Sequence, residues 1–153
     1  VTDTGKARLL AARELYRRAM YREAAQNVVT VRSAADALPL VLAMGGQDVE
    51  WLGALFLDRR GRVLGSRILS RGTTGFTIMD PAQVLRAALG AGASSVLLLH
   101  NHPSGGPLPS SDDRMATSRM AEAARVLGIA LLDHIVVGGG GTYWSFAEKG
   151  QMP

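Results

Sequence analysis

A stretch of almost uninterrupted apolar residues near the middle of the chain constrains the fold more than any other feature of the sequence. Residues 94–100 read SSVLLLH, which lacks the alternation of apolar and polar residues that a strand with one solvent-exposed face shows. The sequence therefore predicts a central strand that is buried on both faces and ends at the histidines His100 and His102.

The segments on either side of this strand alternate between strand and helix patterns. They are a hairpin at residues 50–58 and 62–70 with a turn of Arg59, Arg60 and Gly61, a helix at 81–90, a helix at 112–128, and a second hairpin at 130–138 and 142–146 around four glycines. This order predicts an α/β domain in which helices pack on a mixed β-sheet.

The expected helix ends carry capping residues. Asp80 precedes Pro81, a residue type that favours the first helical position, and Gln83 is expected to complete the cap. The helix at 112–128 is expected to end at a glycine and to bury one apolar face. That face holds Ala116, Met120, Ala123, Ala124 and Leu127.

Length and composition suit one main domain with a helical segment in front of it. The chain has 153 residues, 47% of them hydrophobic, which suits a single core. Residues 6–26 are rich in helix-forming residue types, and a second helix is expected at Ser33, where Asp36 completes a capping box. We therefore predict a helical segment at residues 1–45 and the main domain at residues 46–153.

Composition also limits the class of protein and the ligands that it can offer. No stretch approaches the roughly 18 consecutive apolar residues of a membrane span, and the amino end lacks the layout of a secretion signal. The absence of cysteine fits a reducing compartment and leaves nitrogen and oxygen as metal ligands. The net charge of +4 would suit nucleic acid, but four arginines gather within residues 13–22, which favours a solvated helix face. We expect a soluble, cytoplasmic protein without a membrane partner.

Two of the three histidines lie at the end of the buried strand. His100 and His102 are two residues apart, so in an extended chain both imidazoles point to the same side, roughly 6.5 Å apart along the backbone. Pro103 and two nearby glycines then turn the chain, and Asp113 in the first turn of the next helix can offer an oxygen. Two nitrogens, one carboxylate and an open position form the ligand set of a catalytic zinc ion.

Ser110 and Asp113 allow a second interpretation. Their spacing is also that of a helix capping box, so both side chains can serve a purely structural role. Capping does not explain two convergent histidines, however, and one first turn can hold a cap and a ligand together.

Residues 100–113, HNHPSGGPLPSSDD, resemble the metal motif of the JAMM (JAB1/MPN) domain, with His-x-His, seven residues, Ser, two residues and Asp. Over residues 50–146 the segments EWLGALFLD, SRGT, HNHPSG, PSSDD and LLDHIVVG, together with the helix that begins at Pro81 and with Thr117, resemble the bacterial RadC family. The resemblance implies a JAB1/MPN-like (cytidine-deaminase-like) mixed β-sheet flanked by helices. Residues 1–20 loosely resemble the tail of the helix-hairpin-helix module that precedes this domain in RadC proteins. The chain departs from the family at Gly138–Gly141, where an acidic or polar turn is common.

The resemblance also implies a role for each residue of the site. His100, His102 and Asp113 would bind one zinc ion, Glu50 would activate a water molecule, and Ser110 would support the oxyanion. These roles would make the chain a zinc metallohydrolase that acts on a peptide or isopeptide bond.

Residue patterns alone also favour Glu50 over the other acidic residues. Glu50 begins a strand whose same-face neighbours, Leu52 among them, are expected to be buried, so its carboxylate would lie at the edge of the core. Asp58 adjoins the hairpin turn, where a hydrogen-bonding role is favoured. For His134, within the strand at 130–138, a supporting or packing role is favoured over substrate contact.

Two other functions remain open at this stage. A metal-dependent nuclease or phosphodiesterase is suggested by the basic net charge and by the historical link of the RadC name to DNA repair. A non-catalytic MPN interaction module is the second alternative, although such modules usually lose the metal ligands that this chain keeps. We expect a peptide or protein substrate, with nucleic acid as the alternative, and the sequence predicts no oligomeric state.

Overall fold

Strand β3 (Ser95–Asn101) lies at the centre of a sheet with the strand order β2-β1-β3-β4-β5. The computed structural model describes residues 29–44, 49–72, 79–103 and 105–153. The other strands are β1 (Trp51–Leu57), β2 (Val63–Arg71), β4 (Ala130–Val137) and β5 (Tyr143–Ser145). Strand β3 is antiparallel to β1 and parallel to β4, so the mixed sheet and its buried central strand are confirmed.

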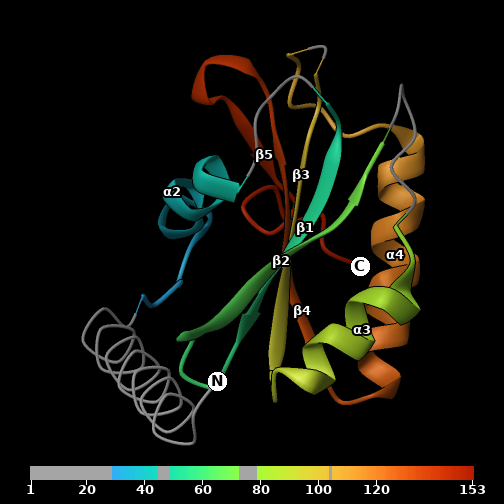
Figure 1. The fold of residues 1–153 in the computed structure, drawn as a ribbon. Coiled ribbons are helices and arrows are strands. Elements are labelled where there is room, and N and C mark those ends of the chain that lie inside the picture. Colours follow the sequence, from blue (N-terminus) through green and yellow to red (C-terminus); the bar gives the residue numbers. More distant parts are fainter. Residues whose placement is uncertain (1–28, 45–48, 73–78, 104) are drawn as a thin grey trace, which may run out of the picture.

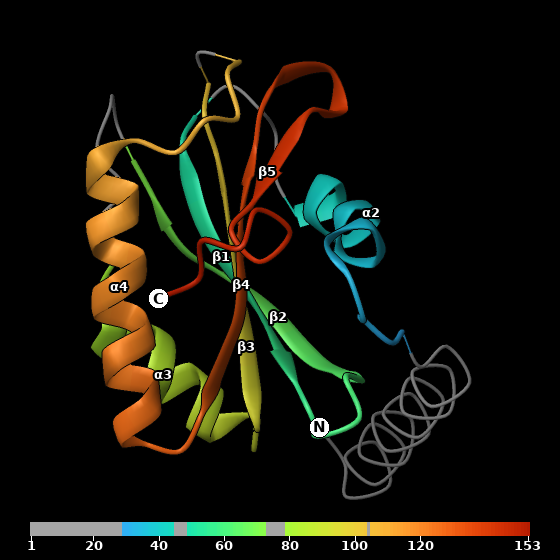
Figure 2. The same cartoon turned by 180° about the vertical axis from the view of Figure 1, so that it is seen from behind.

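Helices lie on both faces of this sheet (Figure 1). On one face are α3 (Pro81–Gly90) and α4 (Ser111–Val126), which supplies the crossover between the parallel strands β3 and β4. On the other face is α2 (Ala34–Met44), and the view from behind in Figure 2 shows the same separation. This arrangement confirms the predicted α/β fold.

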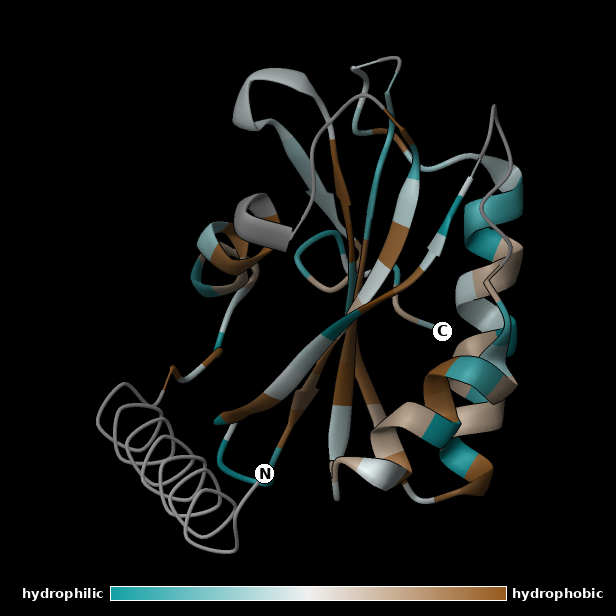
Figure 3. Cartoon of the chain, viewed as in Figure 1, coloured by the Kyte–Doolittle hydropathy of each residue, from teal (hydrophilic) through white to brown (hydrophobic). Residues whose placement is uncertain are grey.

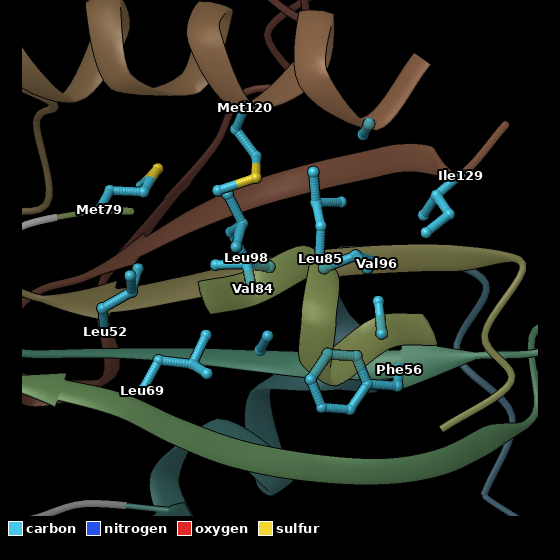
Figure 4. Packing of buried hydrophobic residues seen from close by; sticks show 13 residues of the cluster. Leu52, Phe56, Leu69, Met79, Val84, Leu85, Val96, Leu98, Met120 and Ile129 are labelled. Atoms are coloured by element: carbon cyan, nitrogen blue, oxygen red, sulfur yellow. The ribbon is translucent and has the colours of Figure 1, made fainter. Parts of the chain in front are cut away.

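Two apolar clusters fill the space between the helices and the sheet. Hydrophobic residues run along the central strands (Figure 3), and successive residues point to opposite faces. Leu52 and Leu98 therefore pack with Met120 of α4 (Figure 4), whereas Leu55 and its neighbours pack with Val41 of α2. Burial on both faces explains why the central strands carry apolar residues without alternation.

Local hydrogen bonds explain most helix and turn boundaries, with two corrections. Asp80 caps α3 as predicted, but the Gln83 amide donates to the Leu69 carbonyl of β2 at 2.8 Å. Leu127 is 48% exposed, so its predicted place on the buried face of α4 is wrong. Thr117 lies on that face and is fully buried. In the β1–β2 turn, Asp58 accepts hydrogen bonds from two backbone amides and from a guanidinium.

The predicted amino-terminal segment is described only in part. Ser33 and Asp36 exchange the hydrogen bonds of the expected capping box at the start of α2. The helix expected at residues 6–26 lies outside the described residues, and the division of the chain near residue 45 stays a prediction. Among the described helices, none is long and apolar enough to cross a membrane.

Candidate metal centre

Three consecutive parts of the chain bring His100, His102 and Asp113 together at one end of the sheet. His100 is the second-last residue of β3, His102 follows the strand directly, and Asp113 lies in the first turn of α4. Figure 1 shows the end of β3, the start of α4 and the turn between β4 and β5 at the same end of the molecule. The predicted convergence of the three side chains therefore occurs.

The three side chains present their ligand atoms to one another. His100 Nε2 lies 2.9 Å from His102 Nε2 and 3.2 Å from Asp113 Oδ1, and His102 Nε2 lies 3.3 Å from Asp113 Oδ2. Tetrahedral zinc with bonds of about 2.0–2.1 Å holds its ligand atoms roughly 3.3 Å apart. The donor set and its spacing fit such an ion, and among the described residues no other group of three histidines or acids meets this condition.

The hydrogen-bond partner of His102 decides which of its ring nitrogens is free. Its Nδ1 lies 2.9 Å from the carbonyl oxygen of Gly106. A carbonyl only accepts hydrogen bonds, so Nδ1 carries a hydrogen, and in the neutral form of the ring the lone pair is on Nε2. The loop that follows β3 thus orients its own histidine.

His100 is oriented by residues from two other elements. Its Nδ1 lies 2.7 Å from His134 Nε2 of β4, and His134 Nδ1 lies 2.7 Å from the Thr117 hydroxyl of α4. His134 is fully buried and stacks on Phe146 with a centroid distance of 5.2 Å. Burial, followed by the charge of His100, lowers the pKa of His134 well below its ordinary value. The supporting role favoured for His134 agrees with this position, while the role of Thr117 was not predicted.

Asp113 combines the two roles that its sequence position allowed. Its Oδ2 accepts hydrogen bonds from the Ser110 amide at 2.7 Å and the Ser110 hydroxyl at 2.8 Å, which completes the capping box of α4. Burial alone would raise the pKa of Asp113, but the hydrogen bond and charge of a protonated His100 and the hydrogen bonds from Ser110 outweigh it. The pKa of Asp113 is therefore held well below its usual range, and the side chain is a carboxylate.

These groups leave an excess of hydrogen-bond acceptors at the site. When both rings are neutral and carry their hydrogens on Nδ1, two lone pairs and a carboxylate face one another at 2.9 to 3.3 Å. A proton can join only one pair of them, whereas a metal ion accepts all three. The arrangement is therefore a candidate metal site.

Glu50 shares a cavity of about 540 Å³ with His100 and Asp113. The Asn101 side chain accepts a hydrogen bond from the Trp51 amide at 2.7 Å and donates one to the Val49 carbonyl at 3.0 Å. Because these two bonds lie on either side of Glu50, they hold the backbone of Glu50 beside the end of β3. The predicted base is thus near the candidate ligands, and the catalytic roles of Glu50 and Ser110 stay predictions.

Known proteins resemble this chain over nearly its whole length. Residues 31–151 match the family of the RadC-like JAB domain. UPF0758 proteins of Herminiimonas arsenicoxydans and Thermotoga maritima are 39% and 36% identical over 95% and 94% of this chain, and that of Listeria monocytogenes is 39% identical over 94%. The chain spans 65%, 64% and 64% of the length of these three relatives. By sequence match and by fold, the chain belongs to the RadC-like JAB domain family.

Proposed function

We propose that this domain is a zinc-dependent hydrolase that cleaves peptide or isopeptide bonds. The observation that carries the proposal is the set of convergent acceptors on His100, His102 and Asp113, with Glu50 in the wall of the cavity that His100 and Asp113 also line. A zinc ion bound there would supply a water whose pKa is near 7 and a Lewis acid for the carbonyl under attack.

Glu50 is the residue best placed to move protons. Glu50 lines the cavity that His100 and Asp113 also line, so its carboxylate can take a proton from the attacking water and deliver it to the departing amine. Its backbone is held on both sides by Asn101, which favours a constant position through both steps.

Ser110 would act only after a rearrangement. Its single hydroxyl hydrogen is donated to Asp113 Oδ2 at 2.8 Å. To stabilise an oxyanion, the hydroxyl must turn away from Asp113, whose Oδ2 would keep the hydrogen bond from the Ser110 amide.

The walls of the cavity favour a peptide over a nucleic acid. Four of the lining residues are acidic and one, Arg119, is basic; the acidic ones are Glu50, Asp80, Asp112 and Asp113. Carboxylates repel the phosphates on which nucleic-acid binding depends. The remaining wall is formed mainly by apolar side chains such as Leu52, Met79 and Met115, which suit an amino-acid side chain.

The first test is a metal analysis of the purified protein without added chelator. We expect about one zinc ion per chain in the wild type and a loss of zinc in His102→Ala, because two ligands then remain. Zinc-free wild-type protein, or equal zinc in the variant, would contradict the metal site.

The second test separates the reactions. Wild type and Glu50→Gln are incubated with a mixed peptide library, with an isopeptide-linked peptide, and with single- and double-stranded DNA, and the products are identified by mass spectrometry and gel electrophoresis. Cleavage of an amide bond that disappears in Glu50→Gln but persists in the control Glu122→Gln, at an exposed position of α4, is the expected result. Cleavage of DNA alone would replace the proposal with the nuclease alternative.

A further inference from the structure

A buried chain of hydrogen bonds connects α4, β4 and β3 behind the candidate metal centre. Thr117 of α4 and His134 of β4 are both fully buried, and His100 of β3 is 2% exposed. Helix α4 packs against strand β4, and Figure 2 shows that the end of α4 leads into this strand. The Thr117 hydroxyl lies 2.6 Å from the Asp113 carbonyl and 2.7 Å from His134 Nδ1, and His134 Nε2 lies 2.7 Å from His100 Nδ1.

Only one arrangement of hydrogens satisfies all three contacts when both rings are neutral. The Asp113 carbonyl can only accept, so Thr117 donates its single hydroxyl hydrogen there. His134 Nδ1 must then donate to the Thr117 oxygen, which leaves a lone pair on His134 Nε2. That lone pair accepts the hydrogen of His100 Nδ1, so His100 Nε2 is left free to face Asp113 and His102.

The chain of hydrogen bonds begins at Asp113 and ends beside it. It starts at the backbone carbonyl of Asp113 and ends at His100, whose Nε2 faces the side chain of the same Asp113 at 3.2 Å. The first turn of α4 is thereby held against the end of β3 by Thr117 and His134. Phe146, stacked on His134 with an interplanar angle of 8°, holds the imidazole ring in its plane.

We infer that Thr117 and His134 are positioning residues that fix the tautomer of His100 and its distance from Asp113 before a metal ion binds. The inference rests on the metal site of the proposed function and extends it to two residues that contact neither metal nor substrate. Partners of this kind typically change metal affinity 10- to 100-fold.

Loss of the Thr117 hydroxyl should allow His134 to adopt the opposite tautomer, with its hydrogen on Nε2. Without an acceptor for its Nδ1 hydrogen, buried His134 can move that hydrogen to Nε2 and donate it to His100 Nδ1. The hydrogen of His100 then moves to Nε2, where it faces Asp113 and blocks the ligand position. Thr117→Val removes the hydroxyl with little change of shape, and Thr117→Ser restores the hydroxyl.

The experiment measures zinc affinity and tautomers together. The dissociation constant for zinc is obtained by competition with a chromophoric chelator for wild type, Thr117→Val, Thr117→Ser and the control Thr30→Val, which lies outside the site beside Arg62. Long-range ¹H–¹⁵N spectra of the metal-free proteins report the tautomer of each histidine. If Thr117 had only a structural role, its substitution would not change these tautomers.

We expect roughly 10- to 100-fold weaker zinc binding in Thr117→Val, with a shift of His134 toward the Nε2–H tautomer. Thr117→Ser and Thr30→Val should stay close to wild type in both measurements. Unchanged zinc affinity in Thr117→Val, beside a wild type that binds zinc, would overturn this inference alone. A wild type that binds no zinc would overturn the metal site and the inference with it.

Discussion

Gly138, at the end of β4, is expected to tolerate no side chain, and the reason is space rather than backbone conformation. Its φ and ψ of −101° and −173° are accessible to any residue. A Cβ atom placed there, however, would lie 2.6 Å from the Gly105 carbonyl oxygen, 2.6 Å from the Thr142 hydroxyl and 2.9 Å from the Pro107 nitrogen. Two of these atoms belong to the backbone of the loop that carries His102, so Gly138→Ala should push that loop away.

The size of the displacement follows from the contacts. Ordinary contact to a Cβ begins near 3.4 Å, so the Gly105 carbonyl must retreat by about 0.8 Å. The same carbonyl accepts the hydrogen bond of the Gly139 amide at 2.9 Å, and that bond would be stretched or lost. Together, crowding and the weakened hydrogen bond should lower the free energy of unfolding by about 2–4 kcal/mol.

The displacement matters for the metal because ligands must be held within about 0.5 Å of their productive geometry. Gly138→Ala should therefore weaken zinc binding at least about tenfold, as measured by chelator competition, and lower the urea midpoint of the metal-free protein. Gly106→Ala is the matched control, since a Cβ at Gly106 meets no atom within 4 Å although its carbonyl holds His102. Equal zinc affinity in the two variants would refute this reasoning.

Two further predictions concern the position of Glu50 and the dependence of the free energy of unfolding on pH in the acid range. In Asn101→Asp the side chain can still accept a hydrogen bond from the Trp51 amide but cannot donate one to the Val49 carbonyl. The rate of hydrolysis should therefore fall roughly 100-fold because Glu50 is misplaced, while the zinc dissociation constant stays within twofold. A wild-type rate of hydrolysis in this variant would contradict the positioning role of Asn101. Burial raises the pKa of Asp133 despite three hydrogen bonds to its carboxylate, so the folded state binds its proton more tightly than the unfolded chain. The stability contributed by this group should therefore fall as the pH rises from about 3.8 through the raised pKa. The free energy of unfolding, measured in urea across this pH range, should show that decline in wild type but not in Asp133→Asn. Identical slopes of this free energy against pH in the two proteins would count against the prediction.

The sequence was sufficient to predict the strands and helices of the described residues and the three candidate ligands, because both depend on local rules. An apolar run such as residues 94–100 is stable in a strand only when both of its faces are buried. Two histidines at positions i and i+2 of a strand point to the same side. The errors at Gln83 and Leu127 have tertiary causes. The Gln83 amide finds a better acceptor on β2, and Leu127 follows the last residue of α4, at a position that is 48% exposed.

The role of Thr117 could not be predicted because it depends on the register between two strands. Leu98 pairs with His134 only after a register shift between Val96 and Leu97, and no local pattern encodes that shift. Thr117 does carry a local signal, since it lies one helical turn after Asp113 on the same face. Without the strand register, however, nothing in the sequence indicates that a histidine faces it.

The candidate ligands lie close together in the sequence, but the groups that orient them are spread over most of the domain. Gly106 orients His102, and the loop that contains it rests on the turn after β4. His100 depends on His134, which follows α4 in the chain. A motif of histidines and an aspartate therefore specifies which atoms can bind a metal, whereas the lone pairs of those atoms are directed by β4 and by the turn that follows it. The candidate ligands end at Asp113, but for this reason the site can be expected to form only in a chain that also contains β4 and the turn that follows it.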